Sequence, residues 1–569
     1  MKIKGATGAE AMLRLLSSMG VERIFASPGS EWAPAWEALA NPDLKDKPMY
    51  LSARHEEIAV GMASGYAKST GKLPAVMVHT SVGSLHASMA LRGALHENVP
   101  MVVLTGESIA FGESPGPDLG AHWLSQLADI GGPARLVERC VKWSLAVNTK
   151  AVFPAAIQRA CQLAMTDPKG PVFVSLPLEF LFGDVTIDAP AQAAIPTPAT
   201  ADSRGLDKLA DMLLSATRPV IVTEECGRSP AAVERLIEIS ELLSIPVVES
   251  RTAPYLNFPR THRLHAGFDS AGILSEADVV LLIATIAPWH PASTGPAAGA
   301  RVAIVDENPL RGDLPYWGYQ ADLCLAGSIE SSLVRLLKRL KARTQKDNAL
   351  RSTFAERWKS RHNDRMKAER LNATACASQQ PMDPRWVLHE LNGMLPPDAI
   401  VVEETITDRE SINLHLDCLN PGQFFAGAIG GLGTGIGTAL GVKCANPTKP
   451  VVLLIGDGTF NYNPALAGLG FAKEHEMPIM IVIMNNHGYL SQKQGVPRHY
   501  PEGWAVKTKT FIGTSITPPP DYAALVRIFG GHGETVEQPG DVRPALERGL
   551  KALATGSVAL VDMRLKPVN

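Results

Sequence analysis

The stretch PVVLLIGDGTFNYNPALAGLGFAKEHEMPIMIVIMNNHGYL, residues 450–490, decides the fold. An apolar run at 451–455 ends in GDG (456–458), and a second run at 479–484 ends in NNHG (485–488), with a helical pattern between them. Such runs, separated by helical patterns, are typical of buried parallel strands joined by helices. A right-handed crossover then brings both strand ends to the same edge of the sheet.

Residues that could bind a metal ion and a phosphate are expected at that edge of the sheet. The carboxylate of Asp457, the amide oxygen of Asn485 or Asn486 and bare glycine backbone converge there. Hard oxygen ligands of this kind suit a Mg²⁺ ion that also holds a phosphate. Gly456 and Gly458 lack the Cβ atoms that would block the approach of that phosphate.

The same alternation of strand and helix patterns continues through the chain and predicts an α/β fold with parallel sheets flanked by helices. The apolar runs fall into three groups, at 74–79, 101–105 and 171–176, at 219–223, 279–283 and 302–305, and at 400–402, 451–455, 479–484 and 558–561.

An Ala/Pro-rich stretch at 189–202 and a charged segment at 341–379 interrupt this alternation and have linker chemistry. We therefore expect three domains, at 1–188, 203–340 and 380–569. Glycine-rich strand ends next to polar residues occur in the first and third domains, so we expect the chemistry to lie between these two.

Composition excludes several classes of protein. The 569 residues are 45% hydrophobic and 20% charged, which is the balance of a globular protein with three or four domains. Lys and Arg total 54 against 57 for Asp and Glu, a net charge of −3, so we expect no nucleic-acid partner.

The seven cysteines are never spaced as CxxC, which argues against a disulfide framework or a structural zinc site. The amino end lacks the long apolar run of a signal peptide, and no uninterrupted apolar stretch approaches the ~20 residues of a membrane span. We therefore expect a cytoplasmic protein with no membrane partner.

The GDG segment, a crossover and then NN resemble the cofactor motif of the thiamine diphosphate-dependent 2-oxo acid decarboxylases and carboligases. The resemblance implies pyrimidine-binding, central and diphosphate-binding domains, with Mg²⁺ held by Asp457, Asn486 and the carbonyl of Gly488. It also implies a set of cofactor-binding residues: Glu56, Thr405, Gly431, Leu432, Gly433, Gly456, Asp457, Gly458, Thr459, Asn486, Gly488 and Tyr489.

A glycine-rich run at 430–437 offers no register of G-x-G-x-x-G, so a dinucleotide fingerprint, and with it a dehydrogenase, is excluded. We instead interpret this run as a segment whose backbone lies close to a flat cofactor. The resemblance gives Leu432 the role of the apolar side chain that bends the cofactor. An ordinary buried leucine at a tight helix entry is the alternative.

Thiamine diphosphate chemistry needs a poorly solvated carboxylic acid at N1′ of the aminopyrimidine, so that C2 of the thiazolium can lose its proton. Arg54-His55-Glu56, before a helical pattern with Gly61 and Gly65, resembles the pyrimidine-binding element, and Glu56 is the matching acid. A zinc-protease HExxH motif is excluded because position 59 is Ala.

Further stretches resemble benzoylformate decarboxylase. Among them are PGS (28–30), VHTSVG (78–83), VKWS (141–144) and EET (403–405), which follow one another in the family order. By this resemblance Ser30 and His79 line the substrate pocket and handle protons, and His290 of the middle domain is a second catalytic histidine. The implied activity is decarboxylation of a 2-oxo acid, a small-molecule substrate, through a C2 carbanion and an enamine.

The sequence departs from that enzyme after the metal motif, where HGYLSQK (487–493) is more polar. Acetolactate synthases share the PGS turn, RHE, GGLG, GDG and NN, so a carboligase that joins the enamine to a second carbonyl compound is the alternative. The central domain shows no sign of an FAD or ADP site. In this family Glu56 usually meets the phosphate ligands of another subunit, which implies a homodimer or homotetramer with active sites at subunit interfaces.

Overall fold

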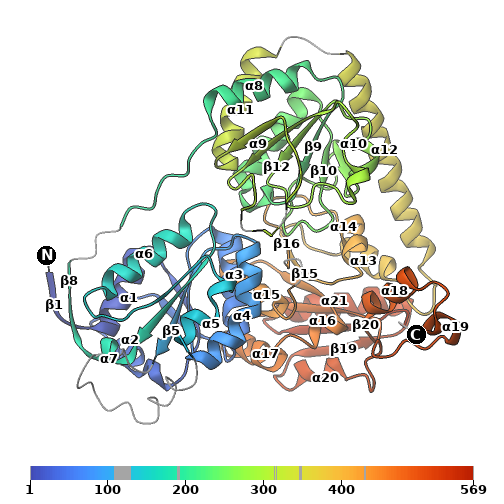
Figure 1. Ribbon diagram of the computed structural model, residues 1–569. Helices are drawn as coiled ribbons and strands as arrows, with labels where there is room; N and C mark the ends of the chain where they lie inside the picture. The colour runs from blue at the N-terminus through green and yellow to red at the C-terminus, as the bar shows by residue number, and fades with distance from the viewer. Residues whose placement is uncertain are drawn as a thin grey trace.

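The computed structural model describes residues 2–107, 130–188, 193–312, 314–315, 317–344, 349–427 and 431–567. The N-terminal and C-terminal parts of the chain lie side by side, and the middle part sits above them (Figure 1). Gly430 of the glycine-rich run and residues 189–192 of the first expected linker lie outside the described residues.

Within the described residues, the N-terminal part holds a six-stranded parallel sheet. Its strands lie in the order β3 (Met49–Ser52), β2 (Arg23–Ser27), β4 (Ala75–Val78), β5 (Met101–Glu107), β7 (Pro171–Pro177) and β6 (Trp143–Ala146). Its helices are α1 (Gly8–Ser18), α2 (Ala33–Ala40), α3 (Glu56–Thr70), α4 (Ser81–His96), α5 (Gly132–Leu136), α6 (Phe153–Met165) and α7 (Leu178–Phe182). An antiparallel pair, β1 (Lys2–Thr7) with β8 (Asp184–Asp188), joins the two ends of this part.

The C-terminal part repeats this architecture with a second parallel sheet. The strands lie in the order β16 (Phe424–Ala426), β15 (Ile400–Glu404), β17 (Val451–Gly456), β18 (Met480–Asn485), β20 (Ala559–Arg564) and β19 (His532–Val536). In both sheets the strands, numbered along the chain, run 2-1-3-4-6-5. The helices are α13 (Pro384–Asn392), α14 (Arg409–His415), α15 (Gly435–Ala445), α16 (Asp457–Phe460), α17 (Ala465–Glu474), α18 (Leu490–His499), α19 (Trp504–Thr508), α20 (Tyr522–Arg527) and α21 (Val542–Ala554).

The middle part has a different order, 3-2-1-4-5-6, which is that of doubly wound nucleotide-binding folds. Its parallel strands are β11 (His265–Gly267), β10 (Val247–Glu249), β9 (Pro219–Thr223), β12 (Val279–Ile283), β13 (Arg301–Asp306) and β14 (Leu323–Ala326). The helices are α8 (Ser203–Ser215), α9 (Pro230–Leu243), α10 (Ala271–Leu274) and α11 (Ile329–Arg343). The predicted α/β class with parallel sheets is therefore confirmed in all three parts.

The charged segment expected as the second linker forms α12 (Ala349–Ala375), a long helix that runs from the middle part down to the C-terminal part (Figure 1). Its first half is anchored, because the Arg351 guanidinium donates to the carbonyls of Leu213 and Ala216. Phe354 and Trp358 are buried against the middle sheet. None of the helices in the described residues is both long and apolar enough to cross a membrane.

Close packing of α3 on α15 joins the N-terminal part to the C-terminal part. Gly61 and Gly65 of α3 face Gly437 and Gly441 of α15, so the two backbones touch. A Cβ atom at Gly65 would lie 2.1 Å from the carbonyl oxygen of Thr438, and one at Gly441 would lie 2.0 Å from that of Met62. Apolar residues of both helices belong to one continuous core.

We predict that Gly65→Ala destabilises the protein, because the added methyl group forces α3 and α15 apart. Overpacking of this kind costs about 1–3 kcal/mol, which outweighs the gain of at most ~1 kcal/mol in helix propensity. The thermal unfolding midpoint measures the effect. Gly93→Ala in α4 is the matched control, since nothing lies within 4 Å of its Cβ position. A midpoint for Gly65→Ala equal to that of Gly93→Ala would contradict the close contact.

Candidate active site

Two of the predicted catalytic residues follow the strands at which the order of the N-terminal sheet reverses. β2 and β4 are neighbours, but the chain leaves them toward opposite sides of the sheet, which leaves a crevice at their carboxyl ends. Ser30 lies in the turn after β2, and His79 directly follows β4. The structure therefore brings Ser30 and His79 to one crevice.

His79 is held by a carboxylate that the sequence analysis missed. Its Nδ1 lies 2.8 Å from Oε2 of Glu31, whose side chain is completely buried. This hydrogen bond is the main reason that the pKa of His79 is raised, whereas burial acts in the opposite direction. The pairing fixes the ring so that Nε2 is the nitrogen left for a substrate.

Two glycines make room for the Glu31–His79 pair. A Cβ atom at Gly29 would lie 2.1 Å from Nδ1 of His79, and one at Gly106 would lie 2.2 Å from Cγ of Glu31. Gly106 belongs to β5, next to β4 in the sheet. An acid directly after the PGS turn is the signal in the sequence that could have identified Glu31.

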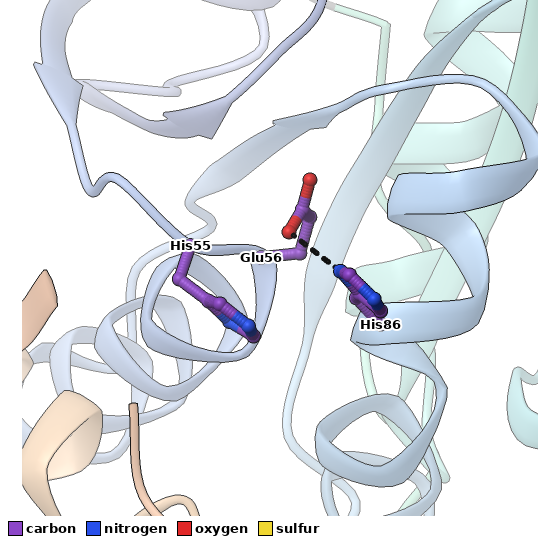
Figure 2. Close-up of side chains that lie close together, drawn as sticks. All are labelled: His55, Glu56 and His86. Atoms are coloured by element: carbon purple, nitrogen blue, oxygen red, sulfur yellow. Dashed lines mark ion pairs between the residues drawn. The ribbon is translucent and has the colours of Figure 1, made fainter. Parts of the chain in front are cut away.

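Glu56 is the first residue of α3, at the end of the connection from β3. The helix begins there because Nδ1 of His55 accepts a hydrogen bond from the Glu57 amide at 3.1 Å and so caps its N-terminus. The Glu56 carboxylate is nearly buried and lies 3.5 Å from Nδ1 of His86 on α4 (Figure 2). A Cβ atom at Gly83 would be 3.0 Å from Glu56 and 3.0 Å from His79, so both side chains border the same turn of α4.

The predicted metal ligands lie at the matching crevice of the C-terminal sheet. Asp457 directly follows β17, at the reversal between β15 and β17, and Asn486 directly follows β18. Backbone N–H groups of Gly458, Asn486 and Gly488 face the Asp457 carboxylate, while burial raises the pKa of this carboxyl to about 6. The structure therefore brings GDG and NNHG together, as the sequence predicts.

The other predicted cofactor-binding residues lie in segments next to the GDG and NNHG segments. Thr405 follows β15 and donates its hydroxyl to Glu403, and Thr459 donates to the carbonyls of Glu404 and Gly456. Tyr489 lies against Gly458, where a Cβ atom would be 3.0 Å from its ring. The loop with Gly431, Leu432 and Gly433 precedes α15.

Gly433 has a φ of 97°, and a Cβ atom there would lie 2.8 Å from the carbonyl oxygen of Tyr462. Gly437, the last residue of the glycine-rich run, faces Ile58 and Gly61 of α3. Beside the predicted approach to a cofactor, this end of the run therefore packs one domain against another.

Consecutive glutamates at the start of α3 face different neighbours, as expected for positions 100° apart on a helix. Glu57 points to the same chain's C-terminal part, where Gly433 and Glu404 are its neighbours, and burial together with Glu404 raises its pKa to about 7. Glu56 faces His86 instead. In the described residues no hydrogen bond or ion pair joins Glu56 or His79 to Asp457 or Asn486.

His290 is exposed in the loop after β12 of the middle part. Within the described ranges it has no hydrogen bond or ion pair to His79 or Glu56. At the carboxyl ends of β9 and β12 in the middle sheet, the Glu224 carboxylate accepts hydrogen bonds from the amides of Ile286 at 2.7 Å and Ala287 at 3.1 Å, and it borders a cavity.

Comparison with known proteins identifies the family. Residues 6–130 match the N-terminal TPP binding domain of thiamine pyrophosphate enzymes, residues 206–336 match the central domain, and residues 410–563 match the C-terminal TPP binding domain. The chain belongs to the thiamine pyrophosphate enzymes. The expected resemblance to this superfamily is thereby confirmed.

The proteins that are similar to this thiamine pyrophosphate enzyme include enzymes with two different activities. Benzoylformate decarboxylase from Pseudomonas aeruginosa is 26% identical, covering 98% of this chain and 99% of that protein. The mitochondrial acetolactate synthase catalytic subunit from Aspergillus candidus is 25% identical, covering 95% of this chain and 78% of that protein. The chain is therefore an enzyme of the decarboxylase and acetolactate synthase type.

Solved structures share the fold. The thiamine diphosphate-dependent 4-hydroxybenzoylformate decarboxylase from Rhodococcus jostii RHA1 matches with a TM-score of 0.79 and 23% identity over 99% of both chains. Benzoylformate decarboxylase from Polynucleobacter necessarius matches with a TM-score of 0.78 and 21% identity over 99% of both chains.

The C-terminal crevice of this thiamine pyrophosphate enzyme fits a cation and a diphosphate. Oδ2 of Asp457 is buried and has no hydrogen-bond partner among the described residues. A buried carboxylate oxygen without a partner is costly unless a ligand satisfies it. Gly456, which has no Cβ atom, precedes Asp457 and is partly exposed.

We predict that Glu31→Gln lowers the pKa of His79, because the variant loses the carboxylate that raises it while burial still lowers it. NMR titration of the His79 ring measures the change. Because the folded protein then binds this proton more weakly, Glu31→Gln should lose more free energy of unfolding at about pH 5.5 than at about pH 9. Glu37→Gln, at an exposed position of α2, is the matched control. An unchanged His79 titration in Glu31→Gln would contradict the pairing.

Proposed function

We propose that the protein is a thiamine diphosphate- and Mg²⁺-dependent lyase that decarboxylates a 2-oxo acid, in the manner of benzoylformate decarboxylase. The observation that carries this proposal is the Glu31–His79 pair beside Ser30. An imidazole held in one orientation by a buried carboxylate can donate a hydrogen bond to a developing alkoxide and later return a proton. His290 is the candidate for a second catalytic histidine. It has less support than His79, because it lies on the middle part and not at the crevice of the N-terminal sheet.

The C-terminal crevice would hold the cofactor. Asp457, Asn486 and the Gly488 carbonyl would bind Mg²⁺, which in turn binds the diphosphate. Thr405, Thr459 and the backbone around Gly458 would line the diphosphate and its linker. Gly431, Gly433 and Tyr489 would border the rings, and Leu432 would bend the cofactor between them.

When bound, thiamine diphosphate would supply a nucleophilic carbon, C2, for the 2-oxo group and, in its positively charged thiazolium ring, an acceptor for the electron pair released with CO₂. Glu56 would hold the proton at N1′ that this activation requires, since its nearly buried carboxyl is poorly solvated. Ser30 and His79 would orient the carboxylate and the oxygen of the 2-oxo acid.

A carboligase of the acetolactate synthase type is the second candidate. The specific observation in its favour is that acetolactate synthases match this chain as well as benzoylformate decarboxylase does, at 25–27% identity. Such an enzyme would use the same cofactor residues and differ in the acceptor, a second carbonyl compound in place of a proton.

We further propose a homodimer or homotetramer with the active site between subunits, in the cytoplasm. Glu56 and Asp457 sit at the matching crevices of two parts whose mutual contact involves other residues of α3. Val82, Leu85 and Met89 form an exposed apolar stripe on α4, next to the Glu56 contact. A second copy that covers this stripe would bring its Asp457 crevice to Glu56.

Complementation tests this arrangement. Glu56→Gln and Asp457→Ala should each be inactive alone, because the first loses proton transfer at N1′ and the second loses the cation that holds the diphosphate. Co-expressed chains should regain activity, since a mixed dimer has one site with both native residues. The measurement is CO₂ release by purified mixed dimers. No recovery of activity would place both residues in the same chain's site.

His79→Ala separates the two activities. A decarboxylase that relies on the imidazole should lose about 10²-fold or more in single-turnover CO₂ release, with cofactor affinity unchanged. The assay uses a panel of pyruvate, benzoylformate, phenylpyruvate and oxalyl-CoA, with and without an aldehyde acceptor, and scores CO₂ and coupled products.

The matched control is His262→Ala, which removes a histidine that contacts Glu241 at 3.2 Å in the middle part. Unchanged CO₂ release in His79→Ala, with a change in the acceptor used, would favour the carboligase.

A further inference from the structure

The turn that carries two of the proposed cation ligands has a strained backbone. Asn486 and Gly488 flank His487, whose φ of 59° lies in the left-handed region that residues with a Cβ atom rarely adopt. The backbone N–H groups of Asn486 and Gly488 face the Asp457 carboxylate. A turn of this kind keeps its shape only where neighbouring groups hold it.

Asn485, the last residue of β18, holds this turn. Its Oδ1 accepts a hydrogen bond from the His487 amide at 3.0 Å, which is the pattern of an Asx turn. The residue is 1% exposed, and its backbone carbonyl accepts a hydrogen bond from the Leu565 amide at 2.8 Å. Because the backbone is fixed in this way, what remains to be decided is whether the oxygen or the nitrogen of the Asn485 amide points at the turn.

Asp562 of β20 decides between these two orientations. Its Oδ1 accepts a hydrogen bond from Nδ2 of Asn485 at 2.7 Å, and its Oδ2 lies 2.9 Å from Nη2 of Arg564. An ionised carboxylate accepts hydrogen bonds and donates none. Asp562 therefore turns the nitrogen of Asn485 toward itself, which leaves the oxygen of Asn485 for the His487 amide.

A contribution to the stability of the sheet alone is the alternative use of Asp562. The parallel ladder between β18 and β20 already joins the two strands over the whole length of Met480–Asn485. The Asp562 side chain is completely buried, and burying a charge costs free energy that the ladder does not require. The hydrogen bond to Asn485 gives this charge a purpose that a stable sheet would not need.

We propose that Asp562 is a positioning residue of the cation site. Through Asn485 it holds the turn in which Asn486 and Gly488 face Asp457. The inference rests on the proposed function, which assigns the cation to these three residues. Asp562 and Asn485 would act without contacting the cation themselves. Residues that orient metal ligands in this way typically change metal affinity on the order of 10- to 100-fold.

The test measures Mn²⁺ affinity in the presence of thiamine diphosphate, by electron paramagnetic resonance of the free ion. Asp562→Asn should weaken binding about tenfold or more, because asparagine has one oxygen for the two donors of Asn485 and Arg564. Asp562→Glu keeps the charge but displaces the oxygens by one methylene group, so it should weaken binding as well. It carries the test if Asp562→Asn does not fold.

Glu390→Gln is the matched control. It removes another buried carboxylate of the C-terminal part, one that accepts a hydrogen bond from Arg543 at 3.1 Å. This variant should bind Mn²⁺ with the affinity of the wild type. Wild-type affinity in Asp562→Asn, or an equal loss in Glu390→Gln, would overturn the proposal.

A double-mutant cycle tests the path through Asn485. Asn485→Ala should itself weaken Mn²⁺ binding, and Asp562→Asn should then change the affinity by less than about twofold further. If the lost charge instead acted on the cation directly, Asp562→Asn would weaken binding by the same factor in both backgrounds, and the proposal would be wrong.

Activity gives a second readout. The Mg²⁺ concentration for half-maximal CO₂ release should rise in Asp562→Asn, and kcat should recover at saturating Mg²⁺, because the ligands are displaced and not lost. A lower kcat with an unchanged half-maximal Mg²⁺ concentration would indicate a general structural effect and contradict the proposal. Wild-type protein that binds no Mn²⁺ in the presence of thiamine diphosphate would instead overturn the proposed function.

Discussion

The contact between α3 and α15 is the constraint on which the other features depend. Two glycines on each helix let the two backbones come into contact, and this contact joins the N-terminal sheet to the C-terminal sheet. It also fixes the direction of the glutamates at the start of α3. Glu57 is buried against its own chain's C-terminal part, so Glu56, 100° further round, is turned toward α4. A side chain at Gly61 or Gly65 would move both carboxylates, because α3 would have to shift as a body.

Most strands inside the sheets could be predicted from the sequence, whereas the edge strands and the interior strands β2 and β10 could not. Runs such as 219–223 and 279–283 coincide with β9 and β12, which are covered on both faces and therefore read as continuous apolar segments. Edge strands such as β3, β14 and β19 have only four or five residues and bury one residue each, so they do not read as long apolar runs. Nor could the sequence show that the first and third sheets have the same strand order, because strand order depends on contacts between distant segments.

The candidate site likewise contains residues that could be predicted from the sequence and residues that could not. Asp457 and Asn486 could be found because each directly follows a strongly apolar strand, and the structure places them together. Glu31 directly follows the PGS turn, which is a signal in the sequence, but its pairing with His79, 48 residues further along the chain, is created by folding and could not be predicted. Glu224 is a similar case, since only the folded middle sheet places its carboxylate on the amides of Ile286 and Ala287.

The shared strand order of the outer sheets gives their loops and helices a one-to-one correspondence. The loops that carry Ser30 and His79 in one sheet correspond to those that carry Thr405 and Asp457 in the other, and α3 corresponds to α15. The two helices that pack together are therefore the same element of the two sheets, so the N-terminal and C-terminal parts meet through equivalent surfaces.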